Sequence, residues 1–340
     1  WARRMRRVFY CGEWLQSHAL HIHLLAAPDF LGYDSAMAAA GAYPDEVRRG
    51  LLLQGLGNDI MRLVGGRSVH PVGVRVGGFY RAPDPEAVAA LRARLRDALP
   101  AAEELVLWTA ALSIPEHEQD VIQVALRHPD EYPLNEGRVI ADDGLDIPIA
   151  EYEAHFTESH APHSTALHSD YHGHPYLVGP LARLNLNLDR LPAPVRRNLE
   201  RTGLEFPSRN MYHSVVARAV EVHYAVVEAL RILDAYRPAE PGVPVVPRAG
   251  VGYGATEAPR GLLWHRWETG ADGRVTAAKI VPPTSQNQAR IEEDLRQSLE
   301  ALGPEASDDS LRVKGETVIR NYDPCISCAT HFLRLQVRRR

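Results

Sequence analysis

Long stretches of the chain in which apolar residues recur at the spacing of an α-helix constrain the fold more than any other feature. Residues 12–27, 84–99, 211–233 and 291–302 each place such residues along one face, as core-facing helices do. In the third stretch the pattern persists for about six turns. Together with shorter β-type segments, these stretches predict a mainly α fold with small β elements, that is, an α+β fold.

Capping residues indicate where these helices begin and end. Asp84 followed by Pro85 is an N-cap residue with proline at the first helical position, so a helix is expected to begin there. Proline interrupts helical hydrogen bonding, and Pro28 and Pro100 are therefore expected to end the first two helices. Gly303, which precedes another proline, is expected to stop the last one.

Size and composition favour one large folded domain over residues 1–340. Hydrophobic residues make up 45% of the chain and charged residues 24%, which excludes a disordered protein. The net charge of -5 gives no overall basic field, so nucleic acid is not an expected partner. No apolar run approaches the roughly 18 residues of a membrane span. The scarcity of cysteine, with 3 in the chain, favours a reducing compartment.

A predicted β-hairpin near residue 270 brings two separate segments together. Residues 260–268 and 275–281 are rich in aromatic and branched side chains and flank a Gly-Ala-Asp-Gly turn. A turn centred between residues 271 and 272 pairs positions that sum to about 543, which puts Arg260 opposite Pro283, next to Thr284 and Ser285. An arginine on such a wall can donate to an anionic ligand, although this segment alone favours an ordinary surface arginine.

The strongest local signal is Asp323-Pro324-Cys325-Ile326-Ser327-Cys328, followed by His331 near the end of the sequence. Asp323 ahead of a proline predicts an N-cap, so both cysteines are expected in the first turns of a helix. The helix dipole and unpaired backbone N–H groups favour thiolates there, and the thiolate is the form of cysteine that binds metals. Their spacing places Cys325 and Cys328 on one face, which His331 continues.

Other interpretations of this cysteine pair stay open on the residues alone. A buried, inert pair is about as frequent as a functional one. A redox-active pair is also possible, as is half of a zinc site. Zinc would need two further ligands, and the chain has no second Cys-x-x-Cys motif.

Histidines crowd one stretch of the chain, and a metal cluster there is the first hypothesis to consider. Their spacing matches no ligand pattern and prolines interrupt any common helical face, so surface and loop positions are favoured. Histidines of the first helix are expected to be partly buried: His18, His21 and His23. The crowded stretch contains His155, His160, His163, His168, His172 and His174.

Several motifs, in order from about residue 9 to residue 331, strongly resemble the large subunit of [NiFe]-hydrogenases. They are GEWLQSHALHIHLLAAPDFLGY, GGRSVHPVGVRVGGF, PHSTALHS, GPLARLNLN, EAPRG, VPPTSQN and DPCISCATH. The first is most similar to the cytoplasmic, multisubunit branch that couples hydrogen to NAD(P) or a similar carrier. The resemblance implies a large-subunit fold and reversible, heterolytic cleavage of H2.

The resemblance also implies the metal ligands. Four cysteines would hold a nickel–iron pair, with cyanide and carbon monoxide on the iron, and two of the four come from the C-terminal motif. Cys325 would be a terminal thiolate of nickel, and Cys328 would bridge nickel and iron, since soft thiolates suit nickel. His331 matches a histidine that ligates a nearby magnesium or iron ion.

Residues around the metals are implied in the same way. Arg260 would polarise H2 or act as the base, although a guanidinium loses its proton only at high cost, and Cys325 is the competing base. The implied catalytic residues are Arg260, Asp323 and Cys325. The segments that cradle the cyanide and carbon monoxide ligands of the iron are matched by Pro259, Arg260, Thr284 and Ser285.

Two departures from the family pattern bear on the site. The RxCGxC motif and the N-terminal glutamate used for proton transfer are both absent, because Cys11 matches a later helix of the family. The chain begins at Trp1, so a preceding segment with these groups is expected to be missing. Ser17 occupies the position of an acidic residue in membrane-bound members.

Partner proteins follow from the same resemblance. Three cysteines cannot hold an iron–sulfur cluster beside a nickel site, which implies a separate iron–sulfur small subunit. NAD(P)-reducing, diaphorase-type subunits, nickel-insertion proteins and a protease that removes the residues after His331 are implied too. The competing hypothesis is a metal-free electron-transfer scaffold, similar to the respiratory complex I subunit of the same fold. The paired cysteines argue against it, because a metal-free descendant needs no thiolates at this spacing.

Overall fold

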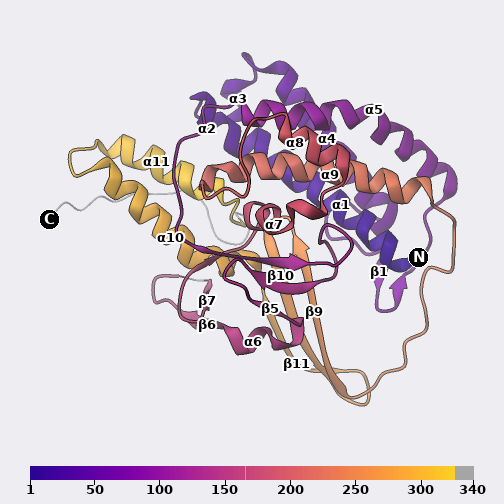
Figure 1. Cartoon of the computed structure of the whole chain (residues 1–340). Helices are drawn as coiled ribbons and strands as arrows, with labels where there is room; N and C mark the ends of the chain where they lie inside the picture. Colours follow the sequence, from indigo (N-terminus) through magenta and orange to yellow (C-terminus); the bar gives the residue numbers. More distant parts are fainter. Residues whose placement is uncertain (165, 326–340) are drawn as a thin grey trace.

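Long helices pack side by side in one layer of the computed structural model, which describes residues 1–164 and 166–325 (Figure 1). In that layer α9 (Ser214–Asp234) contacts both α1 (Ala2–Leu20) and α5 (Pro85–Ala110), and α4 (Pro44–Gly65) packs along α1. Almost all of α9 is buried, so the helix forms core on all its sides rather than on one stripe. With small sheets below the helices, the predicted α+β class is confirmed.

Glycines allow α1 and α4 to approach closely. A Cβ atom on Gly57 would lie 2.4 Å from the backbone nitrogen of Gln16 and 2.6 Å from the carbonyl oxygen of Gly12. No residue with a side chain fits at that separation without moving the backbone of α1. The contact fixes the position of the α1 residues that follow Gln16, which include the buried His18.

Two helix ends predicted from proline are wrong. The first helix continues through a π-helical turn, η1 (His21–Ala26), into α2 (Ala27–Leu31), where Pro28 occupies a first-turn position that needs no N–H donor. Helix α5 runs through Pro100 to Ala110. The cost of an interior proline, about 3 kcal/mol, is outweighed by burial of the apolar side chains that follow it, namely Ala102, Leu105 and Val106.

The predicted start at Asp84 and the predicted stop at Gly303 are confirmed. The Oδ2 atom of Asp84 accepts a hydrogen bond from the backbone N–H of Ala87 at 2.9 Å, as an N-cap residue should. Gly303 follows the last residue of α10 (Pro283–Leu302) with a positive φ of 80°. Helix α10 and helix α11 (Asp308–Asn321) form a helical hairpin that extends to the left in Figure 1.

A three-stranded antiparallel sheet contains the predicted hairpin, with a different register. Its strands are β9 (Gly250–Ala258), β10 (Gly261–Thr269) and β11 (Val275–Val281), in the order β11-β10-β9. Trp264 faces Val281, so paired positions sum to 545, because the ladder is irregular at Glu268 and Thr269. Arg260 does not face Pro283: it lies in the tight turn that joins β9 to β10.

A second sheet and two small hairpins complete the β structure. The sheet has the order β5-β4-β3-β8, with β3 and β8 parallel, and shares an apolar cluster with β10 through Val124, Leu126 and Trp264. The crowded histidines fall on or next to the β6–β7 hairpin, half-buried or exposed as expected. The bounds are β1 (Val74–Arg75), β2 (Gly78–Phe79), β3 (Ile122–Arg127), β4 (Arg138–Ala141), β5 (Asp146–Ile147), β6 (Phe156–His160), β7 (Leu167–Tyr171) and β8 (Tyr176–Leu177).

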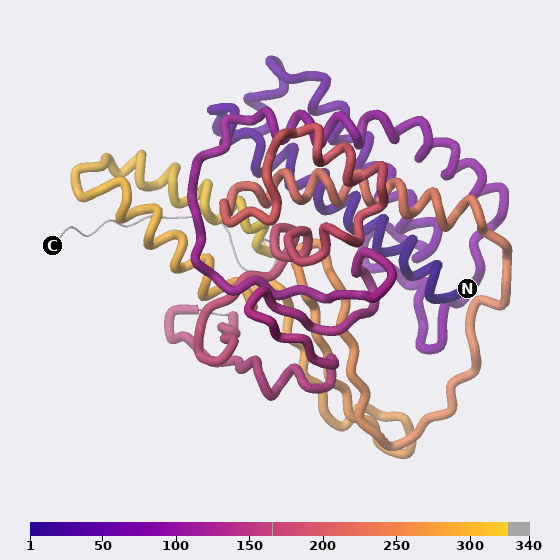
Figure 2. Tube along the Cα trace, viewed as in Figure 1, coloured from indigo at the N-terminus to yellow at the C-terminus, as the bar shows by residue number. Residues whose placement is uncertain are grey.

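The segment between α9 and β9 runs along the edge of the molecule from the helical layer to the far end of the three-stranded sheet (Figure 2). Val246 in this segment is 78% exposed, and pairing of Gly242 with Gly78 attaches the segment to the β1–β2 hairpin. None of the helices in the described part of the chain has the length and apolar content to cross a bilayer. The remaining elements are α3 (Ala36–Ala39), η2 (Ile149–Glu151), α6 (Tyr152–His155), α7 (Pro180–Asn187), η3 (Leu188–Arg190), α8 (Ala193–Glu200) and η4 (Met211–His213).

Candidate metal centre

Arg260 and Asp323, which are far apart in the sequence, meet through two hydrogen bonds. The Nε atom of Arg260 donates to the backbone oxygen of Asp323 at 2.5 Å, and Nη2 donates to its Oδ1 atom at 3.1 Å. Arg260 comes from the turn between β9 and β10, and Asp323 follows the end of α11. The fold therefore brings two of the predicted catalytic residues together directly before Cys325.

The backbone of Asp323 differs from the predicted N-cap. Its φ is +53°, in the left-handed region, and its N–H donates to the carbonyl of Arg320 to close the last turn of α11. An N-cap residue has an extended backbone, so this part of the prediction is wrong. Left-handed conformations of residues other than glycine are uncommon and concentrate at functional sites. Burial raises the pKa of Asp323, and the charges of Arg218 and Arg260 oppose that rise.

Arg218 of α9 is a second cation at this place, and the sequence did not point to it. Its side chain is 2% exposed, its Nη1 atom lies 3.8 Å from Oδ2 of Asp323, and its Nη2 atom donates to the carbonyl of Asn321 at 3.5 Å. Burial lowers the pKa of Arg218 to about 10, so it is charged at neutral pH. Its Nε and Nη1 atoms and Oδ2 of Asp323 have no hydrogen-bond partner among the described residues.

A buried ion network supports the turn that carries Arg260 through hydrogen bonds to the turn's backbone. Arg183 of α7 donates from Nε and Nη2 to the two carboxylate oxygens of Glu221, each at 2.7 Å, and from Nη1 to Glu257 at 2.7 Å. The same guanidinium donates to the backbone oxygens of Ala258 and Pro259, which immediately precede Arg260. Burial alone would raise the pKa of Glu221, but Arg183 and a histidine lower it to about 2.

Two buried histidines, one bonded to this network and one to the end of α11, are neutral groups near Arg218. Burial lowers the pKa of His18 to about 4, and that of His21 well below its usual value. The Nε2 atom of His18 donates to ionised Glu221 at 2.9 Å, and Nε2 of His21 donates to the carbonyl of Arg320 at 2.7 Å, since both acceptors lack a proton. Partial burial was predicted for these histidines, and the structure buries both completely. Their hydrogen-bond partners were not predicted.

Thr284 and Ser285 belong to the first turn of α10, where the hydroxyl of Ser285 donates to the carbonyl of Pro282 at 2.9 Å. The two residues that follow, Gln286 and Asn287, connect this turn to β10 and to the two arginines. The side chain of Gln286 donates to the carbonyl of Leu262 at 2.5 Å, and Asn287 lines a cavity of about 20 Å³ together with Arg218 and Arg260. Such a cavity holds about one water-sized molecule.

The cysteines differ in what they offer a metal. Cys11 is fully buried in the apolar core, and burial raises the pKa of its thiol, so it is no thiolate ligand. Cys325 is half-buried and follows the Asp323-Pro324 pair, two residues beyond the carboxyl group that Arg218 and Arg260 flank. Cys328 and His331 lie outside the described residues. The unsatisfied guanidinium donors of Arg218 lie at Asp323, two residues before Cys325, and suit a centre built on thiolates, because cations favour the ionised thiol.

Several residues of the site were not singled out from the sequence, although some signals were present. Arg183 stands in the GPLAR motif, and Arg218 and Glu221 interrupt the apolar period of residues 211–233, which is unusual for a helix buried on all sides. Glu13 was not singled out either. Burial raises the pKa of Glu13 and the charge of Arg260 opposes that rise, so the two groups interact electrostatically. Asp323 is therefore not alone as an acidic group near Arg260.

Known proteins resemble the chain over most of its length. A family model described as nickel-dependent hydrogenase matches residues 148–331. Sulfhydrogenase 1 subunit alpha of Pyrococcus furiosus is 34% identical over 97% of this chain and 78% of its own length. The NAD-reducing hydrogenase HoxS subunit beta of Cupriavidus necator is 29% identical over 98% of this chain and 76% of its own. A crystal structure of an NAD+-reducing [NiFe]-hydrogenase in the H2-reduced state superposes with a TM-score of 0.82, at 26% identity over 97% of this chain and 80% of the other.

Proposed function

Because the chain belongs to the nickel-dependent hydrogenase family and is the catalytic large subunit of a [NiFe]-hydrogenase, we propose that Cys325 and Cys328 hold its nickel–iron centre. The chain is an oxidoreductase that acts on hydrogen. His331 would ligate a magnesium or iron ion beside the centre. Thiolates and imidazole are the ligand types that nickel and iron accept. When bound, the centre supplies the redox chemistry of H2 cleavage.

Arg260 is proposed to donate hydrogen bonds to cyanide and carbon monoxide on the iron, with Pro259, Thr284 and Ser285 completing the cradle. Two features of the structure support this. The guanidinium of Arg260 lies at the tip of a turn that Arg183 fixes from behind. Pro282 at the N-cap of α10 has no side-chain acceptor, which leaves the first N–H groups of that helix for other acceptors. Cyanide nitrogen is such an acceptor.

The proton is proposed to pass to the Sγ atom of Cys325. Arg260 donates two hydrogen bonds to Asp323, which stabilises the cationic guanidinium and makes it a poor base. A thiolate at Cys325, stabilised by Arg218 and Arg260, can accept a proton at neutral pH. In this proposal Asp323, expected from the resemblance to be catalytic, acts as a positioning residue that orients Arg260.

The relatives are the alpha subunit of a sulfhydrogenase and the beta subunit of HoxS, each one subunit of a multisubunit hydrogenase, so a small subunit is a partner of this chain. We propose that this partner carries the iron–sulfur clusters and that none is held here, since two of the 3 cysteines serve the metal centre. Diaphorase-type subunits would pass electrons to NAD(P) in the cytoplasm. Nickel-insertion proteins and a maturation protease are the remaining proposed partners. No finding favours a metal-free scaffold.

The replacement Cys325→Ser tests the proposal in the full-length subunit matured with its partner. Nickel and H2/D2 exchange activity are both expected to be lost, because a serine hydroxyl is a poor ligand for nickel. Cys11→Ala is the matched control, since it removes a thiol from the apolar core and should keep both. Nickel retained by Cys325→Ser, or absent from the unmodified protein, would overturn the assignment.

A further inference from the structure

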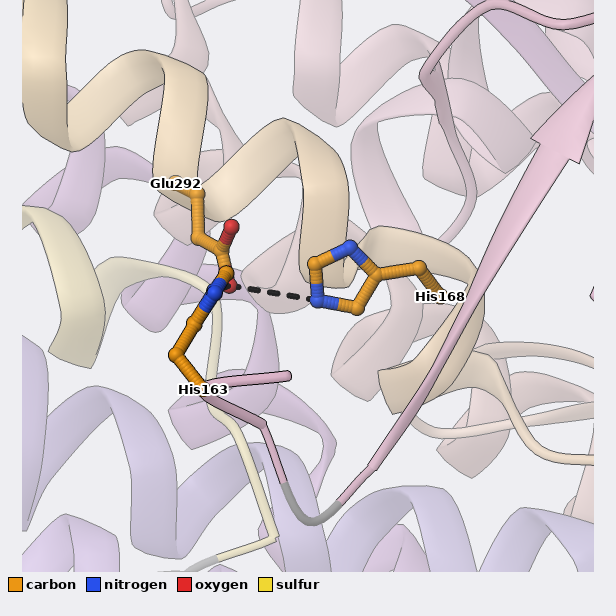
Figure 3. Close-up of side chains that lie close together, drawn as sticks. All are labelled: His163, His168 and Glu292. Atoms are coloured by element: carbon orange, nitrogen blue, oxygen red, sulfur yellow. Dashed lines mark hydrogen bonds and ion pairs between the residues drawn. The ribbon is translucent and has the colours of Figure 1, made fainter. Parts of the chain in front are cut away.

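A cluster of potential metal ligands lies away from the centre described above. His163 comes from the loop between β6 and β7, His168 from β7 and Glu292 from α10 (Figure 3). One nitrogen of each histidine and one carboxylate oxygen of Glu292 all lie within 4.8 Å of one another. The spacing of the histidines matches no ligand pattern because the third ligand, Glu292, comes from a helix far along the chain.

The distances within the cluster suit a small tetrahedral ion. The Nε2 atom of His163 is 3.0 Å and that of His168 3.2 Å from Oε1 of Glu292. Ligands at about 2.0–2.1 Å from a tetrahedral zinc ion are about 3.3–3.4 Å apart, close to both of these distances. The two imidazole rings are inclined at 78°, and their Nε2 atoms both approach the same carboxylate instead of stacking.

One ligand atom is buried and unsatisfied. The side chain of His168 is 12% exposed, and its Nε2 atom makes no hydrogen bond of good geometry to any described residue despite its approach to Glu292. A buried polar atom without a partner is unfavourable, and a cation would remove that cost. Gln288, one turn earlier on α10, donates to Oε1 of Glu292 at 3.2 Å, as residues that orient a metal ligand do.

Charge and access favour a cation at the same place. Although burial raises the pKa of Glu292, the hydrogen bonds from His163 and Gln288 outweigh it and lower the pKa, so the carboxylate is ionised at neutral pH. Glu292 also lines an open cavity of about 960 Å³, which provides an entry path. Its wall carries both signs of charge: the carboxylates of Asp120, Asp142, Asp143 and Glu293, and the guanidinium groups of Arg209, Arg290 and Arg296.

We propose that His163, His168 and Glu292 bind a divalent zinc ion through Nε2, Nε2 and Oε1, with the fourth position open to water. Two imidazoles and one carboxylate form a zinc ligand set, and zinc needs no redox partner. The ion would fasten the β6–β7 hairpin to α10, whose first turn contains Thr284 and Ser285. This site does not depend on the nickel–iron centre, since none of its ligands belongs to that centre.

Zinc binding is measured on the untagged complex of this subunit and its partner. After equilibration with micromolar ZnCl2 and gel filtration, elemental analysis should find about one zinc ion per large subunit beyond the nickel and iron. His168→Gln and Glu292→Gln are expected to lose that ion, and Gln288→Ala to weaken its binding about ten- to hundredfold. His160→Gln, an exposed histidine of the same hairpin, is the control and should keep it.

X-ray absorption at the zinc edge identifies the ligands and should show two imidazole nitrogens at about 2.0 Å. Circular dichroism of each variant checks that loss of zinc does not reflect loss of fold. Equal zinc content in the unmodified protein and in both His168→Gln and Glu292→Gln would overturn the proposal. So would an absorption spectrum with only oxygen ligands.

Discussion

Replacing Arg183 with lysine tests the buried ion network most directly. The guanidinium is fully buried and makes two hydrogen bonds to Glu221, one to Glu257 and one to the carbonyl of Ala258, all between 2.7 and 2.8 Å. It also stacks over Trp14, with 4.2 Å between its central carbon and the ring centroid. Arg183→Lys keeps the positive charge but carries its three N–H donors on a single nitrogen, which lacks the planar fork that spans two carboxylates and a backbone carbonyl.

The magnitude follows from the contacts that lysine cannot make. Loss of two charge-assisted hydrogen bonds costs about 3–6 kcal/mol at about 1.5–3 kcal/mol each. Burial already raises the pKa of Glu257, so this carboxyl can take up a proton when its partner is gone, which favours the lower half of that range. With an unfolding entropy of about 2.1 cal/mol/K per residue, a loss of about 3–4 kcal/mol lowers Tm by about 4–6 °C for a chain of 340 residues.

Calorimetry of the purified complex is the assay, with Arg127→Lys as the matched control. Arg127 also binds one carboxylate through two nitrogens, at 3.0 and 2.7 Å from the oxygens of Asp189, but its side chain is 31% exposed and that of Asp189 56%. An exposed pair contributes about 1 kcal/mol or less, so the control should move Tm by at most about 1–2 °C. Equal losses in the two variants would refute the assignment of stability to the buried network.

Three other outcomes are expected. Arg260→Lys should keep nickel and iron yet slow H2 oxidation roughly tenfold to a hundredfold, because one charge-assisted hydrogen bond of about 1.5–3 kcal/mol is lost; an unchanged rate would exclude Arg260 from the mechanism. Burial lowers the pKa values of His18 and His23 from 6.5 to about 4, so both are neutral in the folded state at neutral pH. The midpoint of denaturant unfolding should therefore be constant above pH 6.5 and fall from pH 6.5 towards pH 4, because the unfolded state takes up protons first. A maximum near pH 5 would contradict this. If a protease completes maturation, the intact mass of the active subunit should correspond to a chain that ends at His331, and a longer active subunit would exclude the step.

Hydrophobic periodicity predicted helices well because burial of an apolar face is a long-range requirement that leaves a regular local pattern. Residues 211–233 are found as η4 and α9, and the Asp84 cap starts α5 as expected. Proline predicted helix ends less well. An interior proline has a fixed, local energetic cost, whereas the free energy gained by burying apolar side chains grows with the length of the helix. Pro100 is tolerated since the helix beyond it covers the core.

Pairing in the sheet could be predicted only in part. The β10–β11 hairpin follows from branched and aromatic residues, but its register depends on an irregularity at residues 268–269 that leaves no sequence signal. Strand β9 was not predicted because Gly250, Gly252 and Gly254 alternate in it, and glycine weakens strand patterns. Arg260 nevertheless lies beside the site, because a tight turn between β9 and β10 presents it towards α11.

The site itself could not be derived from local pattern, because its charges make sense only as a balanced set. If all the buried carboxyls are ionised, three positive groups meet three negative ones, and each carboxyl that takes up a proton makes the site more positive. Burial pushes Glu257 and Asp323 in that direction, while Glu221 is ionised with a pKa of about 2. The net charge of these six groups is therefore zero or positive, and burial raises the pKa of the neighbouring Glu13 as well, so the surroundings of Asp323 favour a thiolate two residues further on. This gives the buried arginines a role where apolar packing alone would be more stable. The set consists of Arg183, Arg218, Arg260, Glu221, Glu257 and Asp323.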